Sequence, residues 1–379
     1  MNIMNTINMW RSGRSLPTLP FAPASMIVFT LLCCVLIPAS GFAEWGCASA
    51  SIVCFAFLLF MTRSRAAILT VGIPSLLIYF STGSFLIPSL LLSITVSVGA
   101  GAFLVNAVRK HYLILLIPAF FLVALALSRN WLLALFAIGT MPALAALAHS
   151  VYDGAPRLGS ICRVSVALAF TFTAFFVLIF SLRDGAFSLD TVRALIDSGK
   201  AAFLTWIEDQ MALEPALFES IEVTAEQYTS AAFALLPAFI ICAFNFLAFS
   251  AHQINISLMK SSEFSRFVSK SNSEFIMSPA AAIAFFGSIV LMLVSPSTGS
   301  RAAATLAENM FMIFMPGLVL VGLMRMLGKY GKKRFGSLTI VFLVLLFLMQ
   351  TWMWLVLMSV IGAFTVLITA YSKKEKKTT

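Results

Sequence analysis

Polar side chains gather at the end of one strongly apolar run, between residues 226 and 260. Asn245 and His252 share a helix face at this spacing, and Gln253 and Asn255 follow them closely. Because an unpaired amide or imidazole is costly in lipid, we expect these groups to face other helices or water. One interpretation is a site or path for a polar ligand. In the other, Asn245 cross-links two helices, and the remaining three residues are wetted at the helix end.

A second polar pair, Glu308 and Asn309, lies near the start of a later apolar run. Ionisable groups are rare among apolar spans, and those present often mark sites of function. The candidate ligand-binding residues are therefore Asn245, His252, Gln253, Asn255, Glu308 and Asn309.

The chain contains no pattern typical of an active site. The histidines are His111, His149 and His252, and no H-E-x-x-H, G-x-S-x-G or phosphate-binding P-loop is present. The cysteines lie inside or at the edges of apolar runs without C-x-x-C spacing, which indicates small buried hydrophobes. We therefore expect no catalytic residues, no metal site and no cofactor, and we do not expect an enzyme.

Composition indicates that a lipid bilayer surrounds most of the chain. Of its 379 residues, 60% are hydrophobic and only 11% are charged, whereas soluble chains carry roughly 25% charged residues. The net charge of +10 comes from short basic clusters between apolar runs. Such clusters keep loops on the cytoplasmic side, so we expect no nucleic-acid partner.

The apolar runs predict an all-α, polytopic transmembrane helix bundle of about 10 to 12 spans, since about 20 apolar residues cross a bilayer as a helix. Near Gly83, Asn130 and Gln350 a hairpin, a re-entrant segment and one broken helix remain alternatives. The candidate spans are residues 25–41, 46–62, 66–82, 84–106, 112–128, 131–149, 161–182, 229–252, 279–296, 303–325, 336–350 and 352–371.

Basic residues fall in alternate loops, which predicts that both termini are cytoplasmic and that the mainly acidic segment 183–228 lies outside. Apolar residues recur at helical spacing from Val192 to Met211, and Pro215 ends the run. This pattern predicts an amphipathic helix that lies on the outer membrane face, covers the bundle, or only connects two spans. Trp206 suits an interfacial depth.

We expect a multi-pass protein of the bacterial cytoplasmic membrane. Prolines and small residues inside the spans predict close helix packing, with one face at Ala280, Ala284 and Ser288 and a hinge at Pro316. The expected organisation is a cytoplasmic segment at 1–22, a first helix group at 23–182, the outer segment at 183–228, a second helix group at 229–372 and a basic cytoplasmic tail at 373–379.

Several segments resemble the YybS-like family of bacterial membrane proteins, whose function is not defined. They are LLPAFIICAFNFLAFSAHQIN, FIMSPAAAIAFFGSIVLML, NMFMIFMPGLVLVGLMRML and LMSVIGAFTVLITAYSKK, with SRAAILTVGIPSLLIYFSTGSF and SVGAGAFLV earlier in the chain. That family is similar to the substrate-capturing membrane subunits of energy-coupling-factor transporters, which bind vitamins or metal ions. This chain has more spans than those subunits and lacks their docking face, so the resemblance transfers no ligand residues.

These patterns predict a transporter or a ligand-capturing transport subunit for a small molecule. The alternative is a non-catalytic membrane scaffold or assembly partner, and a membrane enzyme acting on a lipid-linked substrate is a third possibility. The expected partners are the lipid bilayer, an unidentified small molecule, and either a membrane protein or a second copy of this chain.

Overall fold

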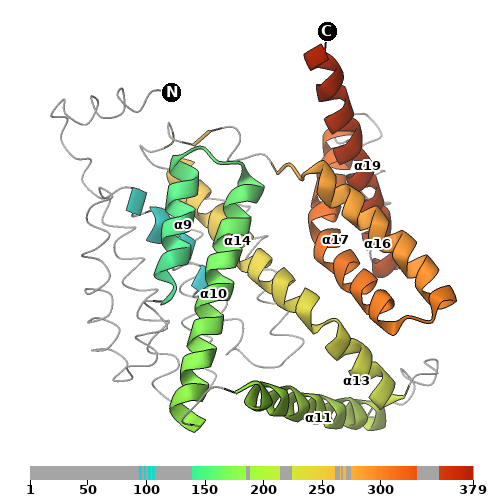
Figure 1. Cartoon of the computed structure of the whole chain (residues 1–379). Helices are drawn as coiled ribbons and strands as arrows, with labels where there is room; N and C mark the ends of the chain where they lie inside the picture. Colours follow the sequence, from blue (N-terminus) through green and yellow to red (C-terminus); the bar gives the residue numbers. More distant parts are fainter. Residues whose placement is uncertain are drawn as a thin grey trace. The chain divides into compact units, whose positions relative to one another are not determined.

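The computed structural model describes residues 94–95, 98–99, 101–103, 105–106, 139–184, 188–213, 224–260, 265, 268–269, 275–330 and 350–378. Every long element in these ranges is a helix, which confirms the all-α prediction (Figure 1). The helices are α9 (Met141–Tyr152), α10 (Arg157–Asp184), α11 (Leu189–Leu213), α13 (Ala225–Ala234), α14 (Leu236–Lys260), α16 (Pro279–Thr298), α17 (Arg301–Tyr330) and α19 (Thr351–Thr378).

Five of the described helices are long and apolar enough to cross a membrane. This finding confirms a multi-pass membrane helix bundle. The total number of spans and the cytoplasmic position of both termini stay predictions, since the spans expected at 25–82 and 112–128 and most of 336–350 lie outside the described residues. The five spans are Arg157–Leu182, Leu236–Lys260, Pro279–Ser297, Arg301–Met326 and Thr351–Ser372.

The chain forms two compact units. The first takes its described residues from Met1–Thr171 and Leu247–Ser273, and the second from Phe172–Phe246 and Glu274–Thr379. Helices α10 and α14 are therefore each divided between the two units, α10 after Thr171 and α14 after Phe246.

Close helix contacts build the core of the first unit. A Cβ on Gly99 would lie 2.7 Å from the carbonyl oxygen of Ala251 in α14, so glycine permits this approach. The hydroxyl of Thr171 in α10 donates to the carbonyl oxygen of Gly139, just before α9. Fully buried side chains fill the space around these contacts: Phe103, Leu147, Leu168, Ile254 and Met259.

In the second unit, α16, α17 and α19 pack against one another (Figure 1). The closest approach joins α17 and α19, where a Cβ on Gly322 would collide with the carbonyl oxygen of Met358, and a Cβ on Gly362 with that of Leu318. Phe285 of α16 and Phe311 of α17 stack with their ring centroids 5.1 Å apart. Small residues thus bring the backbones together, and aromatic rings fill the space beside them.

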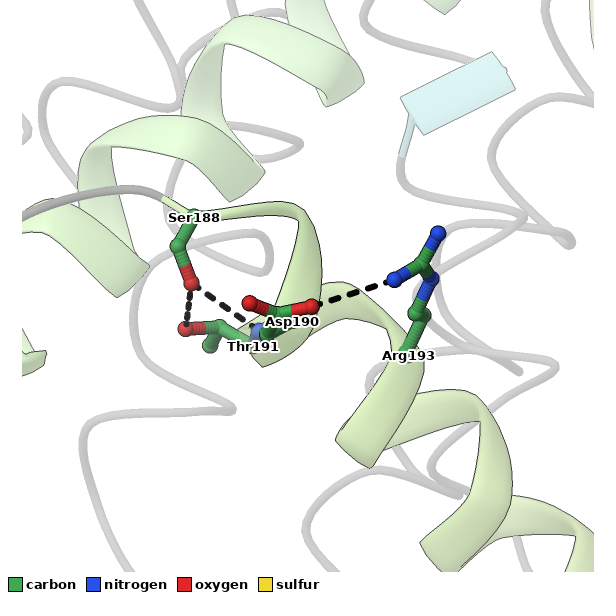
Figure 2. A network of polar contacts seen from close by, with 4 residues as sticks. All are labelled: Ser188, Asp190, Thr191 and Arg193. Carbon is green, nitrogen blue, oxygen red and sulfur yellow. Dashed lines mark hydrogen bonds and ion pairs between the residues drawn. The ribbon is translucent and has the colours of Figure 1, made fainter.

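Helix α11 confirms the amphipathic helix predicted over 192–211. Ser188 caps its N-terminus by accepting a hydrogen bond from the Thr191 amide at 3.1 Å, and Arg193 pairs with Asp190 (Figure 2). Its buried residue is Ile207, while Trp206 remains 51% exposed. The helix rests on α13, where Phe203 meets Phe233 with ring centroids 6.0 Å apart.

Adding a methyl group at the α17–α19 crossing should destabilise the protein. We expect Gly322→Ala and Gly362→Ala each to lower stability by about 1–3 kcal/mol, because the new carbon must displace backbone of the facing helix. Gly287→Ala is the matched control, since Gly287 is exposed and a Cβ there meets nothing within 4 Å. Thermal unfolding of the purified protein in detergent measures the effect, and equal melting of all three variants would contradict it.

Candidate ligand sites

A proline divides the apolar stretch 226–260 into two helices. Pro237 has no amide hydrogen to donate, and it lies in the first turn of α14 just after α13 ends at Ala234. The membrane-spanning helix is therefore Leu236–Lys260, later in the chain than the predicted span 229–252. Thr224 begins α13 with a capping box, in which its side chain and that of Gln227 accept from each other's backbone amides.

Asn309 of α17 replaces a hydrogen bond missing at this break. Its Oδ1 accepts from the amide of Ala238 at 3.0 Å, and its Nδ2 donates to the carbonyl oxygen of Ala234 at 2.8 Å. In an uninterrupted helix, the amide of Ala238 would donate to that carbonyl directly. The side-chain amide satisfies both backbone groups, so Asn309 has a structural role in these contacts.

His252 and Asn255, three residues apart on α14, are completely buried. Each has 0% exposed surface, and the helix continues past them to Lys260 with residues 254–259 all buried. The interpretation that these two side chains are wetted at a helix end is therefore wrong. The sequence suggested it because the basic loop follows closely, but neighbouring elements of the first unit cover this part of α14.

Neither side chain has a hydrogen-bond partner within the part of the chain that the structure describes. Both ring nitrogens of His252 and both amide atoms of Asn255 are buried and unsatisfied. Leaving a buried polar group unsatisfied costs about 1–3 kcal/mol. The first unit thus holds two neighbouring groups that a water molecule or a polar ligand would stabilise.

Arg157 lies beside this pair. Gly154, with φ of 68°, turns the chain after α9, and the carbonyl of Pro156 accepts the amide of Ser160 at the start of α10. The Arg157 guanidinium donates to Oε1 of Gln253 and lies 4.6 Å from the ring centroid of Phe249. The structure therefore brings Arg157, His252, Gln253 and Asn255 together.

Arg157 falls between the predicted spans 131–149 and 161–182, where a basic residue is expected to lie in an exposed loop, yet it is buried with 7% of its surface exposed. One signal in the sequence could have placed Arg157 at the start of a helix instead of in a loop. Proline is common at helix starts, and Pro156 directly precedes Arg157. Asn245 lies on the portion of α14 that belongs to the second unit and is half-buried.

Glu308 lies in the second unit and lines a pocket of about 780 Å³. Helices α11, α13 and α17 form its walls, with Lys200 from α11, Glu226 from α13, and Arg301 and Glu308 from α17. All four charged residues are exposed. Arg301 donates to the hydroxyl of Ser230 at 3.2 Å, which ties the first turn of α17 to α13.

The four charges do not neutralise one another directly. Within the described ranges the ion pairs are His149 with Asp153 and Arg193 with Asp190, both elsewhere in the chain. The hydroxyl of Thr229, another residue of the pocket wall, is buried and has no hydrogen-bond partner among the described residues. The pocket therefore offers two cations, two carboxylates and polar side chains to a ligand.

These arrangements suit binding by hydrogen bonds and charges. Among the residues that the structure describes, no group of three or more His, Cys, Asp or Glu side chains could hold a metal ion. The free thiols of Cys162 and Cys242 lie in two different spans.

The fold and its five apolar helices define an integral, multi-pass membrane protein. Comparisons with protein-family models, with curated proteins and with solved structures find no match.

Replacing Asn309 by leucine should destabilise the protein, because the backbone groups of Ala234 and Ala238 lose their partner. We expect Asn309→Leu to lower stability by about 1–3 kcal/mol, measured by thermal unfolding in detergent. Glu308→Gln is the control, since Glu308 is adjacent and exposed. If the two variants unfold at the same temperature, the amide does not support the break.

Asn255→Leu should have the opposite effect in the absence of any ligand. The leucine has a similar volume and removes two buried unsatisfied atoms, so we expect stability to rise by about 1–3 kcal/mol. Thr365→Val is the control. The hydroxyl of Thr365 already donates to the carbonyl oxygen of Ile361 at 2.8 Å, so removing it should not raise stability. A lower melting temperature for Asn255→Leu would show that Asn255 has a bound partner in the purified protein.

Proposed function

We propose that this protein captures a small polar molecule at the membrane surface, as a transporter or as the ligand-binding subunit of one. The observation that carries the proposal is the pocket of about 780 Å³ lined by Lys200, Glu226, Arg301 and Glu308. Its size falls within the usual range for small-molecule sites, about 300–1,000 Å³. With the topology predicted from the basic loops, the pocket opens on the outer face of a bacterial cytoplasmic membrane.

The helices that form the pocket wall are positioned by contacts with one another. Helix α13 contributes the largest part of the wall, and Ser230 fixes Arg301 against it. Helix α11 covers the site from outside the apolar spans, and its contact with α13 includes the Phe203–Phe233 ring pair.

The buried pair His252 and Asn255 supports transport over a purely structural role. Among the described residues nothing satisfies the polar atoms of these two side chains, and polar groups inside membrane spans often mark the path of a ligand in transport proteins. Helix α14 carries both residues and begins directly after α13, a wall of the pocket.

The scaffold alternative rested on the lack of ionisable groups at mid-bilayer and on small-residue helix faces such as Ala280, Ala284 and Ser288. In the structure Ser288 is buried, and the small residue Gly139 lies close to Thr171 of this same chain. Ala280 is exposed, so a scaffold stays the alternative function. Membership of the YybS-like family, suggested by the sequence segments, is compatible with this proposal.

Filling the pocket should abolish ligand binding. Ala304 lines the pocket on α17, so Ala304→Trp places an indole in it, while Ala302→Trp adds the same ring at an exposed position outside the wall. Both variants and the unmodified protein are screened by thermal shift against amino acids, vitamins, ions and lipid head groups. We expect a compound that stabilises the unmodified protein and Ala302→Trp but not Ala304→Trp.

The hit compound is then offered, radiolabelled, to proteoliposomes that contain the protein. Uptake that Ala304→Trp prevents is the expected result for a transporter, and binding without uptake is expected for a capturing subunit. A compound that stabilises Ala304→Trp as strongly as the unmodified protein, or a screen without any stabilising compound, would contradict the proposal.

A further inference from the structure

The charges in the pocket indicate the chemical class of its ligand. Lys200 and Arg301 are positive, Glu226 and Glu308 are negative, and the four come from three helices. Their sum is zero, so neither a simple cation nor a simple anion can complement all four charges. A ligand that carries both charges can complement both pairs at once.

From this balance we infer that the pocket binds a zwitterion, a molecule or head group with an ammonium and an anionic group a few bonds apart. This inference rests on the proposed function and names its ligand. The ammonium would lie against the Glu226 and Glu308 carboxylates, and the anionic group against the guanidinium of Arg301 and the ammonium of Lys200. Arg301 suits this role because Ser230 holds its guanidinium at the pocket wall.

The absence of ion pairs between these residues supports the inference. Opposite charges on the wall of one pocket that pair with each other would close it, but within the described ranges none of the four pairs with another. Their charges are therefore available to a bound molecule.

Two sources can supply such a ligand. One is a soluble molecule of the amino-acid type, and the other is the phosphoethanolamine head group of a membrane lipid. The second source is consistent with the chain order, because α11, which supplies Lys200, begins shortly after the α10 span ends at Leu182. The same helix exposes Leu195, Trp206 and Leu213, which are residues suited to contact with lipid.

The test compares whole zwitterions with their halves on the full-length protein. Alanine, propionate and ethylamine are titrated at equal ionic strength, and glycerophosphoethanolamine, a phosphodiester with one ammonium and one negative charge, is added as the soluble form of the lipid head group. We expect alanine or glycerophosphoethanolamine to stabilise the protein, with affinities at least about tenfold higher than those of propionate and ethylamine. Nanodiscs with and without phosphatidylethanolamine show whether the lipid itself occupies the pocket, since its presence should then weaken the binding of the soluble probes.

Two variants assign the halves of the ligand to their partners. Arg301→Gln and Glu308→Gln should each weaken zwitterion binding by about tenfold or more, while Glu208→Gln, exposed on α11 and outside the pocket wall, should leave it unchanged. Propionate or ethylamine binding as tightly as the zwitterions would overturn the inference, and so would equal binding by all three variants. If Ala304→Trp abolishes the response to a ligand without both charges, the proposed function holds and the zwitterion assignment fails.

Discussion

Every polar group inside an apolar helix bundle needs a partner from the chain itself or from a ligand, and this constraint governs the structure. The clearest case is the junction of α13 and α14, where Pro237 interrupts the backbone hydrogen bonds. The amide of Asn309 accepts from Ala238 and donates to Ala234, so both backbone groups remain satisfied. Because Asn309 belongs to α17, the same contact joins α14 to the helices that pack against α17.

The same constraint makes His252 and Asn255 unusual. They are as deeply buried as the surrounding apolar residues, and no described residue satisfies their polar atoms. Arg157 and Gln253 beside them form their own hydrogen bond. Within the described residues the amide of Asn309 is hydrogen-bonded, whereas the polar atoms of His252 and Asn255 are not.

The charged pocket follows a different rule, because its residues are exposed and water can solvate them. No energetic penalty forces Lys200, Glu226, Arg301 and Glu308 to pair, and surface ion pairs contribute little stability. In the proposed function their role is recognition, since fixed charges of both signs around one pocket select a ligand by its charge pattern. The proposed capture site therefore lies where water solvates the charged side chains, next to spans that contain few charged residues.

The helical fold, five membrane spans and the amphipathic α11 could be predicted from the sequence, because apolar run length and helical spacing are local properties. Residue type alone also singled out His252, Asn255 and Glu308 as candidates. Which of them are buried became clear from the tertiary structure, since burial depends on helices distant in sequence. Asn309 had no visible partner until α17 packed against the Pro237 break, and Arg157 resembled a loop charge until α10 brought it to Gln253. The four charges of the pocket likewise come together only because α11, α13 and α17 meet.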